Sequence, residues 1–155
     1  VPTTVLACLR NDMRCLLSSS FFAVFGIVIA LMKDVPDAVG DAQFNIRSFT
    51  VRIGQKTVFT AMRRLLTALF FGVGAGFTRY AVQAFAAAAA STSASAAATL
   101  GIGRSIVALS AFAAGISVRQ EAQSVNAEDS GEVYNYYMHL WKLFYASYLV
   151  LPFAR

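Results

Sequence analysis

The apolar residues of this chain gather into long runs separated by shorter polar stretches. The runs cover residues 15–32, 65–78, 105–118 and 143–153, and no charged residue falls inside any of them. A membrane span needs about 20 mostly apolar residues, and a backbone inside lipid must satisfy its own hydrogen bonds. The pattern predicts an all-α transmembrane bundle of about four spanning helices, over residues 14–33, 56–77, 100–118 and 132–151.

The stretches between these runs predict the connections. Residues 34–55 are polar and are expected to form a loop that carries the chemistry. Residues 85–98 read FAAAAASTSASAAA. Alanine favours helix, but this stretch has no amphipathic stripe, so we expect a linker or a weak surface helix. The whole chain, 1–155, is interpreted as a single membrane domain.

Composition and charge narrow the class of partner. The chain is 57% hydrophobic and 14% charged, with a net charge of +5. The cations are scattered rather than interleaved with aromatic residues on one face, which excludes nucleic acid as the expected partner and favours membrane lipids. Arg63 and Arg64 interrupt the second predicted helix. Two arginines in hydrocarbon are costly, so they must either extend to the interface or meet an anion inside the protein.

The segment with candidate chemistry is KDVPDAVGD, residues 33–41. Asp34, Asp37 and Asp41 stand at positions i, i+3 and i+7, which fall within about 60° of one another on a helix. Three like charges on one face repel, and a divalent cation such as Mg²⁺ would offset that repulsion. The cations Arg47, Arg52 and Lys56 follow, and such cations suit phosphate oxygens. The alternative is a solvated acidic helix end with ordinary interfacial cations.

The last predicted helix is dense in aromatic residues. Tyr137, Trp141, Tyr145 and Tyr148 recur at helical spacing and are predicted to share a face. That face could anchor the helix at the interface, pack against its neighbours, or line a prenyl or pigment pocket. His139 is the only histidine, and we expect it to be part of hydrogen-bonded structure rather than a metal ligand.

Two segments resemble one known family. KDVPDAVGD followed by FNIRSFTVRIGQKTVF is similar to the second aspartate-rich motif of UbiA-type prenyltransferases, of the homogentisate phytyltransferase and solanesyltransferase branch. The segment YNYYMHLWKLFYASYLVLPF is similar to the last helix of the same family. The resemblance covers roughly residues 14–78 and 117–155, in the right order, and therefore corresponds to the C-terminal half of such an enzyme.

The resemblance implies a fold and a site. In that family nine helices surround a cavity where two aspartate-rich motifs hold Mg²⁺ on a prenyl diphosphate, and an aromatic acceptor captures the allylic cation. Carried over by position, the Mg²⁺ ligands would be Asp34, Asp37 and Asp41. The residues beside the diphosphate would be Lys33, Arg47, Arg52 and Lys56. The first motif, NxxxDxxxD, and the five preceding helices are absent from this sequence, so we expect the chain to be inactive alone.

Two functions follow as expectations. The first is the C-terminal part of a Mg²⁺-dependent membrane prenyltransferase that acts on an aromatic acceptor such as homogentisate. The second is a non-catalytic transmembrane subunit, derived from that family, in a photosynthetic complex such as a photosystem. Such a subunit would contact partner chains and bound lipid, chlorophyll or carotenoid. Either function implies an integral membrane protein of the plastid envelope or thylakoid.

Overall fold

The computed structural model describes residues 4–90 and 94–154, and these residues form helices with no strand among them. This confirms the expected all-α class. In chain order the elements are α1 (Val5–Asn11), α2 (Met13–Gln43), α3 (Phe49–Ile53), α4 (Gln55–Ala90), α5 (Ala94–Glu121), α6 (Ser130–Val150) and the 3-10 turn η1 (Leu151–Ala154).

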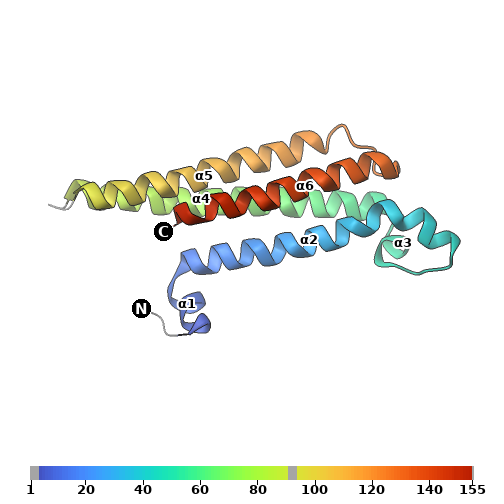
Figure 1. Ribbon diagram of the computed structural model, residues 1–155, viewed down its shortest axis with the longest axis horizontal. Helices are drawn as coiled ribbons and strands as arrows, with labels where there is room; N and C mark the ends of the chain where they lie inside the picture. Colours follow the sequence, from blue (N-terminus) through green and yellow to red (C-terminus); the bar gives the residue numbers. More distant parts are fainter. Residues whose placement is uncertain (1–3, 91–93, 155) are drawn as a thin grey trace.

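The long helices lie roughly side by side along one axis (Figure 1). Helices α4 and α5 form an antiparallel hairpin, and α2 packs against α4 and α6. Figure 1 shows the α4–α5 hairpin extending beyond the start of α2 and the end of α6. The short helix α3 lies at the opposite end of the bundle from both termini.

The core follows a helical stripe along α2. Phe25, Met32 and Val35 are fully buried, at the spacing that keeps side chains on one face of a helix. They pack with buried residues of three other helices: Leu66 and Phe70 of α4, Val118 of α5, and Val133, Tyr136 and Leu140 of α6. In a membrane these side chains gain van der Waals contacts rather than removal from water, and this close packing fixes how α2 sits against α4 and α6.

Small residues let α4 and α5 approach closely. A Cβ added at Gly74 would lie 2.9 Å from the ring of Phe112, and one at Gly115 would lie 3.1 Å from the Cβ of Phe70. Such contacts are tighter than side chains normally make, so a larger residue at either position would displace these phenylalanine side chains. Close helix approach through small residues is typical of membrane bundles.

Three helices are long and apolar enough to cross a membrane, namely α2, α4 and α5. They have 31, 36 and 28 residues. At 1.5 Å per residue they are about 46, 54 and 42 Å long, so each exceeds a hydrocarbon core of about 30 Å. The fourth expected span, α6, has 21 residues and is rich in tyrosine, a composition typical of the membrane interface.

The expected polar loop over residues 34–55 is largely helical instead. Helix α2 continues to Gln43, and α3 covers Phe49–Ile53. The reason is the buried stripe, because Val35 and Ala38 continue it past the last long apolar run. Burial of these two side chains outweighs the breaking tendency of Pro36, and the carboxylates of the motif are carried on a helix.

The expected linker over residues 85–98 also differs from the structure. Residues 85–90 belong to α4 and 94–98 to α5, whereas 91–93 lie outside the described residues. The helices persist because alanine has the highest helix propensity and the two segments pack on each other. A Cβ at Gly101 would lie 2.7 Å from the Phe85 ring, which shows how closely they pack. The helices predicted over residues 56–77 and 100–118 are therefore too short on this side. Helix α4 continues to Ala90, and α5 already begins at Ala94.

Candidate functional site

The aspartate motif lies on the last turns of α2. Val35 and Ala38 face the core, while Asp37 is exposed and Asp34 and Asp41 are half-buried. The three carboxylates therefore lie on the flank and outer side of the helix, at the end of the bundle where α3 turns. This placement agrees with the expectation that they project from the end of a membrane helix.

Two side chains from other helices hold the backbone of the motif. Pro36 lies inside α2 and has no N–H, so the carbonyl of Met32 loses its usual helical partner. Next to this irregular turn, Gln55 Nε2 of α4 donates to the carbonyl of Val35 at 2.8 Å. Ser130 Oγ of α6 donates to the carbonyl of Pro36 at 2.8 Å. The motif is fixed through its backbone, which leaves its carboxylates available.

The carboxylates themselves make no contact with a polar partner. Across residues 4–90 and 94–154, the side-chain carboxylates of Asp34, Asp37 and Asp41 have no hydrogen bond or ion pair. No three His, Cys, Asp or Glu residues in the same ranges lie close enough together to hold a metal ion. Geometry explains this, because residues i and i+7 are about 10.5 Å apart along a helix. Their role as Mg²⁺ ligands stays a prediction.

Adjacent pairs of these carboxylates fit a hard cation better than the full set does. Asp34 and Asp37 are three residues apart, and Asp37 and Asp41 are four apart, so each pair consists of neighbours on the helix surface. Mg²⁺ is usually bound by one or two carboxylates and completes its shell with water and substrate phosphate. The donor set therefore fits Mg²⁺ with Asp37 as the shared member.

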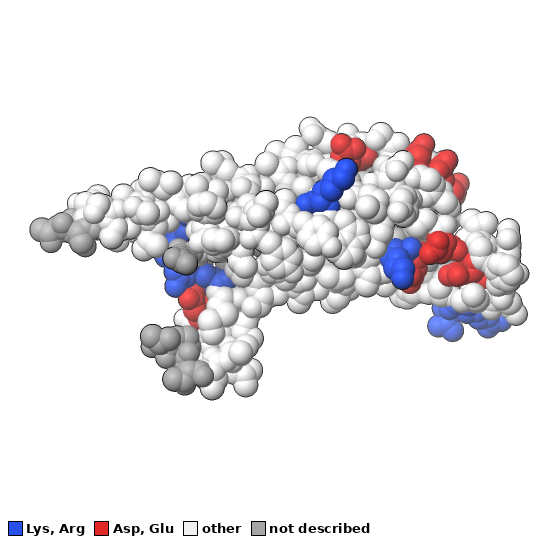
Figure 2. All heavy atoms as spheres, in the orientation of Figure 1, with Lys and Arg blue, Asp and Glu red and all other residues white. Residues whose placement is uncertain are grey.

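The four predicted diphosphate-binding cations lie around the same end of the bundle. Lys33 is on α2, Arg47 precedes α3, Arg52 is in α3 and Lys56 is in the first turn of α4. All four are exposed, and none pairs with an acid of the described residues. Figure 2 shows acidic and basic side chains gathered at this end. A sharp turn at Gly54, with φ of +94°, joins α3 to α4 and brings Lys56 near the motif end. The assignment of these cations stays a prediction.

Helix α3 carries a buried polar atom that the sequence did not predict. Thr50 is 1% exposed, and its Oγ1 has no hydrogen-bond partner among the described residues. An unsatisfied buried hydroxyl costs about 1 to 3 kcal/mol. Thr50 is one of several apolar or hydroxyl residues in FNIRSFTVRI, and nothing in that pattern marks it out.

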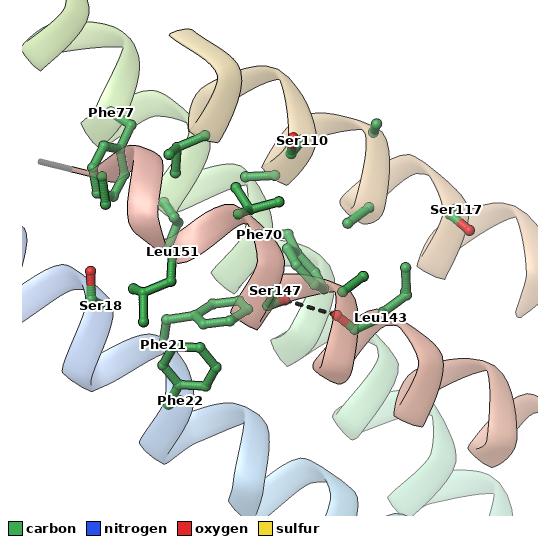
Figure 3. A pocket seen from close by; sticks show the side chains of 18 residues that line it. Ser18, Phe21, Phe22, Phe70, Phe77, Ser110, Ser117, Leu143, Ser147 and Leu151 are labelled. Carbon is green, nitrogen blue, oxygen red and sulfur yellow. Dashed lines mark hydrogen bonds between the residues drawn. The ribbon is translucent and has the colours of Figure 1, made fainter. Parts of the chain in front are cut away.

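An apolar cavity of about 460 Å³ lies between α2, α4, α5 and α6 (Figure 3). Its walls are mainly Phe, Val, Leu and Ala side chains, with Ser18, Ser110, Ser117 and Ser147 as polar exceptions. Ser147 donates to the carbonyl of Leu143 in its own helix at 2.8 Å, so its hydroxyl is satisfied locally. The cavity therefore suits a hydrocarbon group rather than a charged one.

The cavity and the aspartate motif lie at different depths along the bundle. Phe22 lines the cavity and precedes Asp34 by twelve residues, which is about 18 Å along α2. The end of the cavity nearest the motif is marked by Ser117. A ligand with a charged head at the motif and a long apolar tail that reaches the cavity would match this separation in length and in polarity.

Ser117 and His139 join α5 to α6 beside the cavity. Ser117 Oγ and His139 Nε2 are 2.9 Å apart. His139 also lines a second pocket of about 210 Å³, together with Glu121 and Glu132. His139 is thus part of hydrogen-bonded structure, as expected. Its partner could not be predicted from a local pattern, because the two residues are 22 positions apart in different helices.

The aromatic face predicted for α6 is present. Tyr137 and Trp141 are in edge contact at 6.3 Å between ring centroids, and Trp141 stacks on Tyr145 at 5.4 Å. Tyr148 stacks on Phe22 of α2 at 4.7 Å. The face therefore packs against α2 at its C-terminal end, where Phe22 also forms part of the cavity wall.

At the opposite end of the bundle, the carboxylate of Asp12 has hydrogen-bond partners. Asp12 caps the N-terminus of α2 by accepting from the backbone N–H of Arg14 at 2.9 Å. The Arg14 guanidinium also donates to both carboxylate oxygens of Asp12, at 3.0 and 2.8 Å. These bonds hold the pKa of the Asp12 carboxyl below its usual range. Nearby, Arg104 of α5 donates to the carbonyl of Tyr80 at 3.1 Å.

The two arginines inside α4 have different surroundings. Arg64 is exposed and lines a shallow surface pocket with Lys56, Thr57 and Thr60. Arg63 is half-buried and lies within electrostatic range of Tyr136. Neither forms an ion pair with an acid in the described part of the chain. The structure therefore shows no internal anion for either arginine, which favours extension to the interface.

Similarity to known proteins extends over most of the chain. It is 36% identical over 138 residues to "Homogentisate phytyltransferase 1, chloroplastic" of Arabidopsis thaliana, which covers 89% of this chain and 30% of the relative. It is 32% identical to the homogentisate geranylgeranyltransferase of Hordeum vulgare, over 87% of this chain and 29% of the relative. The chain is a homologue of UbiA-type homogentisate prenyltransferases.

The similar proteins are named for more than one aromatic acceptor. The coumarin 8-geranyltransferase 1 of Citrus limon, also a chloroplastic protein, is 30% identical over 89% of this chain and 30% of its own length. This chain thus spans about 30% of the length of these prenyltransferases, as expected for a C-terminal part. No family model and no solved structure matches it. Chloroplastic homologues and three candidate spans together support the expected location in a plastid membrane.

Proposed function

We propose that this chain is the C-terminal part of a membrane prenyltransferase that transfers a prenyl group from a prenyl diphosphate to an aromatic acceptor such as homogentisate. The observation that carries the proposal is the homology to such enzymes over 89% of the chain, joined to three carboxylates that have no partner in the described structure. We further propose that the chain is inactive until the other helices of such an enzyme enclose the substrate.

The motif end is the proposed diphosphate site. Asp34, Asp37 and Asp41 would hold Mg²⁺ through neighbouring pairs of carboxylates. When bound, Mg²⁺ neutralises charge that builds on the departing diphosphate. The cations Lys33, Arg47, Arg52 and Lys56 are exposed at the same end and would bind the remaining phosphate oxygens.

The apolar cavity is the proposed place for the prenyl tail. Phe21, Phe70 and Phe77 line it and would surround the hydrocarbon tail, whereas the allylic carbon, which is bonded to the diphosphate, would lie at the motif end. The separation of about 18 Å along α2 between this cavity and the motif suits a head-and-tail substrate.

A second candidate function is a non-catalytic subunit of a photosynthetic membrane complex. One observation favours it: only 28%, 28% and 33% of the most apolar windows of α2, α4 and α5 are buried within the chain. The remaining apolar surface needs lipid or other helices. In that case the cavity would hold a lipid, chlorophyll or carotenoid in place of a prenyl tail.

The test begins with the chain isolated from its native membranes in mild detergent, together with whatever co-purifies. The fraction is supplied with Mg²⁺, homogentisate and a labelled prenyl diphosphate, and the prenylated product is measured. We expect product in the wild-type fraction and a fall of at least about 100-fold with Asp37→Ala, because electrostatic stabilisation of the leaving group is lost.

Glu128→Gln is the matched control, because Glu128 is an exposed acid outside the motif. It should leave prenyl transfer and assembly unchanged. Recovery of the wild-type chain in a pigment-bearing particle without any prenyl transfer would contradict the enzymatic proposal and support the second candidate.

A further inference from the structure

A shallow basic hollow of about 380 Å³ lies on the outer face of α4, within its first turns. Its lining consists of Lys56, Thr57, Thr60, Ala61 and Arg64. Neighbouring members are one or three residues apart, so they share one face of the helix. The residues that face inward are on the opposite side of α4: they are the buried Val58, Phe59 and Leu66, and Gln55, which bonds to the aspartate motif. The hollow therefore faces away from both the core and the motif.

The hollow lies at the depth of the lipid headgroups. Helix α4 is long and apolar enough to span a membrane, and its uncharged apolar run begins at Leu65, directly after Arg64. Lys56 precedes Arg64 by eight residues, which is about 12 Å along the helix axis. The headgroup layer on each side of a bilayer is about 5 to 8 Å thick. The hollow therefore reaches across this layer, with Arg64 at its inner edge and Lys56 on its aqueous side.

The threonine hydroxyls of α4 are used differently inside the hollow and below it. Within the apolar run, Thr67 and Thr78 each donate to the carbonyl four residues earlier in the helix, at 2.8 Å. Such a bond satisfies a hydroxyl where lipid tails offer no partner. The hydroxyls of Thr57 and Thr60 make no hydrogen bond within residues 4–90 and 94–154, and in the same ranges the two cations of the hollow pair with no acid. The hollow therefore holds two hydroxyl donors and two positive charges that are available to an anion.

We infer that this hollow binds the headgroup of an anionic membrane lipid. The guanidinium of Arg64 donates paired hydrogen bonds to phosphate or sulfonate oxygens, and the hydroxyls of Thr57 and Thr60 donate to the same group. Lys56 adds the attraction of a point charge at the outer edge. Because Lys56 also belongs to the proposed diphosphate cations, the inference rests on Arg64 and the two threonines.

An apolar track that continues from the hollow favours a lipid over a free anion. Ala68, Phe71 and Ala75 follow Arg64 on the same face of α4, and all three are exposed. They lie within the apolar run, where an acyl chain attached to the bound headgroup packs against them. A free phosphate would use the cations but not this track. The site does not involve the aspartate motif or the apolar cavity, so it goes beyond the proposed function and does not depend on it.

The test measures lipid binding to the full chain in detergent micelles by native mass spectrometry. The probe is phosphatidylglycerol, and phosphatidylcholine with the same acyl chains is the zwitterionic comparison, which should bind more weakly. We expect Arg64→Gln to weaken phosphatidylglycerol binding about 10-fold, because charge-assisted hydrogen bonds are lost. Thr60→Val keeps the size and charge of the site and removes one hydroxyl, so we expect binding about 5-fold weaker. Equal binding of the two lipids by the wild-type chain would overturn the inference.

Arg119→Gln is the matched control for the loss of charge. Arg119 is an exposed cation in the last turn of α5, at the same end of the bundle but outside the hollow. This variant should bind phosphatidylglycerol within about twofold of wild type, because solvent screens a distant charge. Equal weakening in Arg64→Gln and Arg119→Gln, or unchanged binding in Thr60→Val, would reduce the effect to diffuse attraction and overturn the site. Inorganic phosphate at the concentration of the lipid should not displace it, and displacement would overturn the assignment to a lipid.

Discussion

The acids at the two ends of α2 differ in how far their carboxylates are satisfied. At the α1 end, Asp12 accepts a backbone N–H of α2 and two donors of Arg14. At the α3 end, Asp34, Asp37 and Asp41 have no polar partner in the described chain, although four exposed cations lie around the same end. An acid that serves the fold has its oxygens satisfied by its neighbours, whereas acids left without partners on an ordered helix are available to a ligand.

The comparison extends to how each segment is held. The Asp12 side chain itself stabilises the start of α2, so its charge and its structural role cannot be separated. The aspartate motif is held through the carbonyls of Val35 and Pro36 by Gln55 and Ser130. Its carboxylates can therefore change partner without loss of the local fold.

The largest expected effect comes from removing the two side chains that hold the motif. Gln55→Ala together with Ser130→Ala removes both hydrogen bonds to the Pro36 turn. We expect the free energy of unfolding to fall by about 1 to 2 kcal/mol, because one bond is half-buried and the other exposed. Reversible unfolding of the chain in SDS micelles measures this loss.

Gln123→Ala with Ser124→Ala is the matched control for that pair. Both residues are exposed, and Ser124 Oγ donates only to the nearby carbonyl of Glu121. The control should be within about 0.5 kcal/mol of wild type. If the two double variants lose equal stability, the motif is not held in the way that the structure indicates.

The second-largest expected loss of stability is at the N-terminus of α2. Asp12→Ala removes an N-cap and an ion pair, and we expect a loss of about 1 kcal/mol. Most of that loss comes from the cap, because both partners of the ion pair are 34% exposed and solvent weakens their attraction. Asp12→Asn retains a capping oxygen and should lose less. Equal losses in the two variants would assign the effect to the ion pair.

The pH dependence of this contribution has a definite sign. The Arg14 guanidinium lowers the pKa of Asp12 in the folded chain relative to the unfolded chain. The stabilisation is therefore fully present above the unfolded carboxyl pKa of about 4, and it is lost as the pH falls below that value through the folded pKa. The difference in stability between wild type and Asp12→Asn should shrink over that acidic range.

Sequence patterns predicted the long helices but not how far they extend. Apolar runs identified four of the helices because lipid-facing and core-facing positions both demand apolar side chains. They missed the helical state of residues 34–43, where Pro36 and three acids are typical of a loop. Only packing against α4 and α6 decides that segment, since burial of Val35 and Ala38 depends on those partners.

The candidate site likewise has a part that the sequence predicts and a part that it does not. Asp34, Asp37 and Asp41 could be proposed from their spacing alone, because they are local in sequence. The contacts of Ser130 with Pro36 and of Ser117 with His139 join residues 94 and 22 positions apart. No local pattern specifies such pairs. They exist because α6 runs back along α2 and also packs against α5, which brings serine hydroxyls into reach.

The smallest expected effect has the opposite sign and separates the two ends most sharply. Replacing Asp34, Asp37 and Asp41 together by asparagine removes repulsion between like charges on one helix face, worth a few tenths of a kcal/mol per pair. We expect the chain to gain about 0.5 kcal/mol in the absence of divalent cations, measured in the same SDS unfolding assay. Addition of Mg²⁺ should stabilise the wild-type chain and leave the triple variant unchanged, because ligand binding to the folded state raises its stability. A loss of stability in the triple variant would mean that these carboxylates serve the fold as Asp12 does, and the distinction between the two ends would no longer hold.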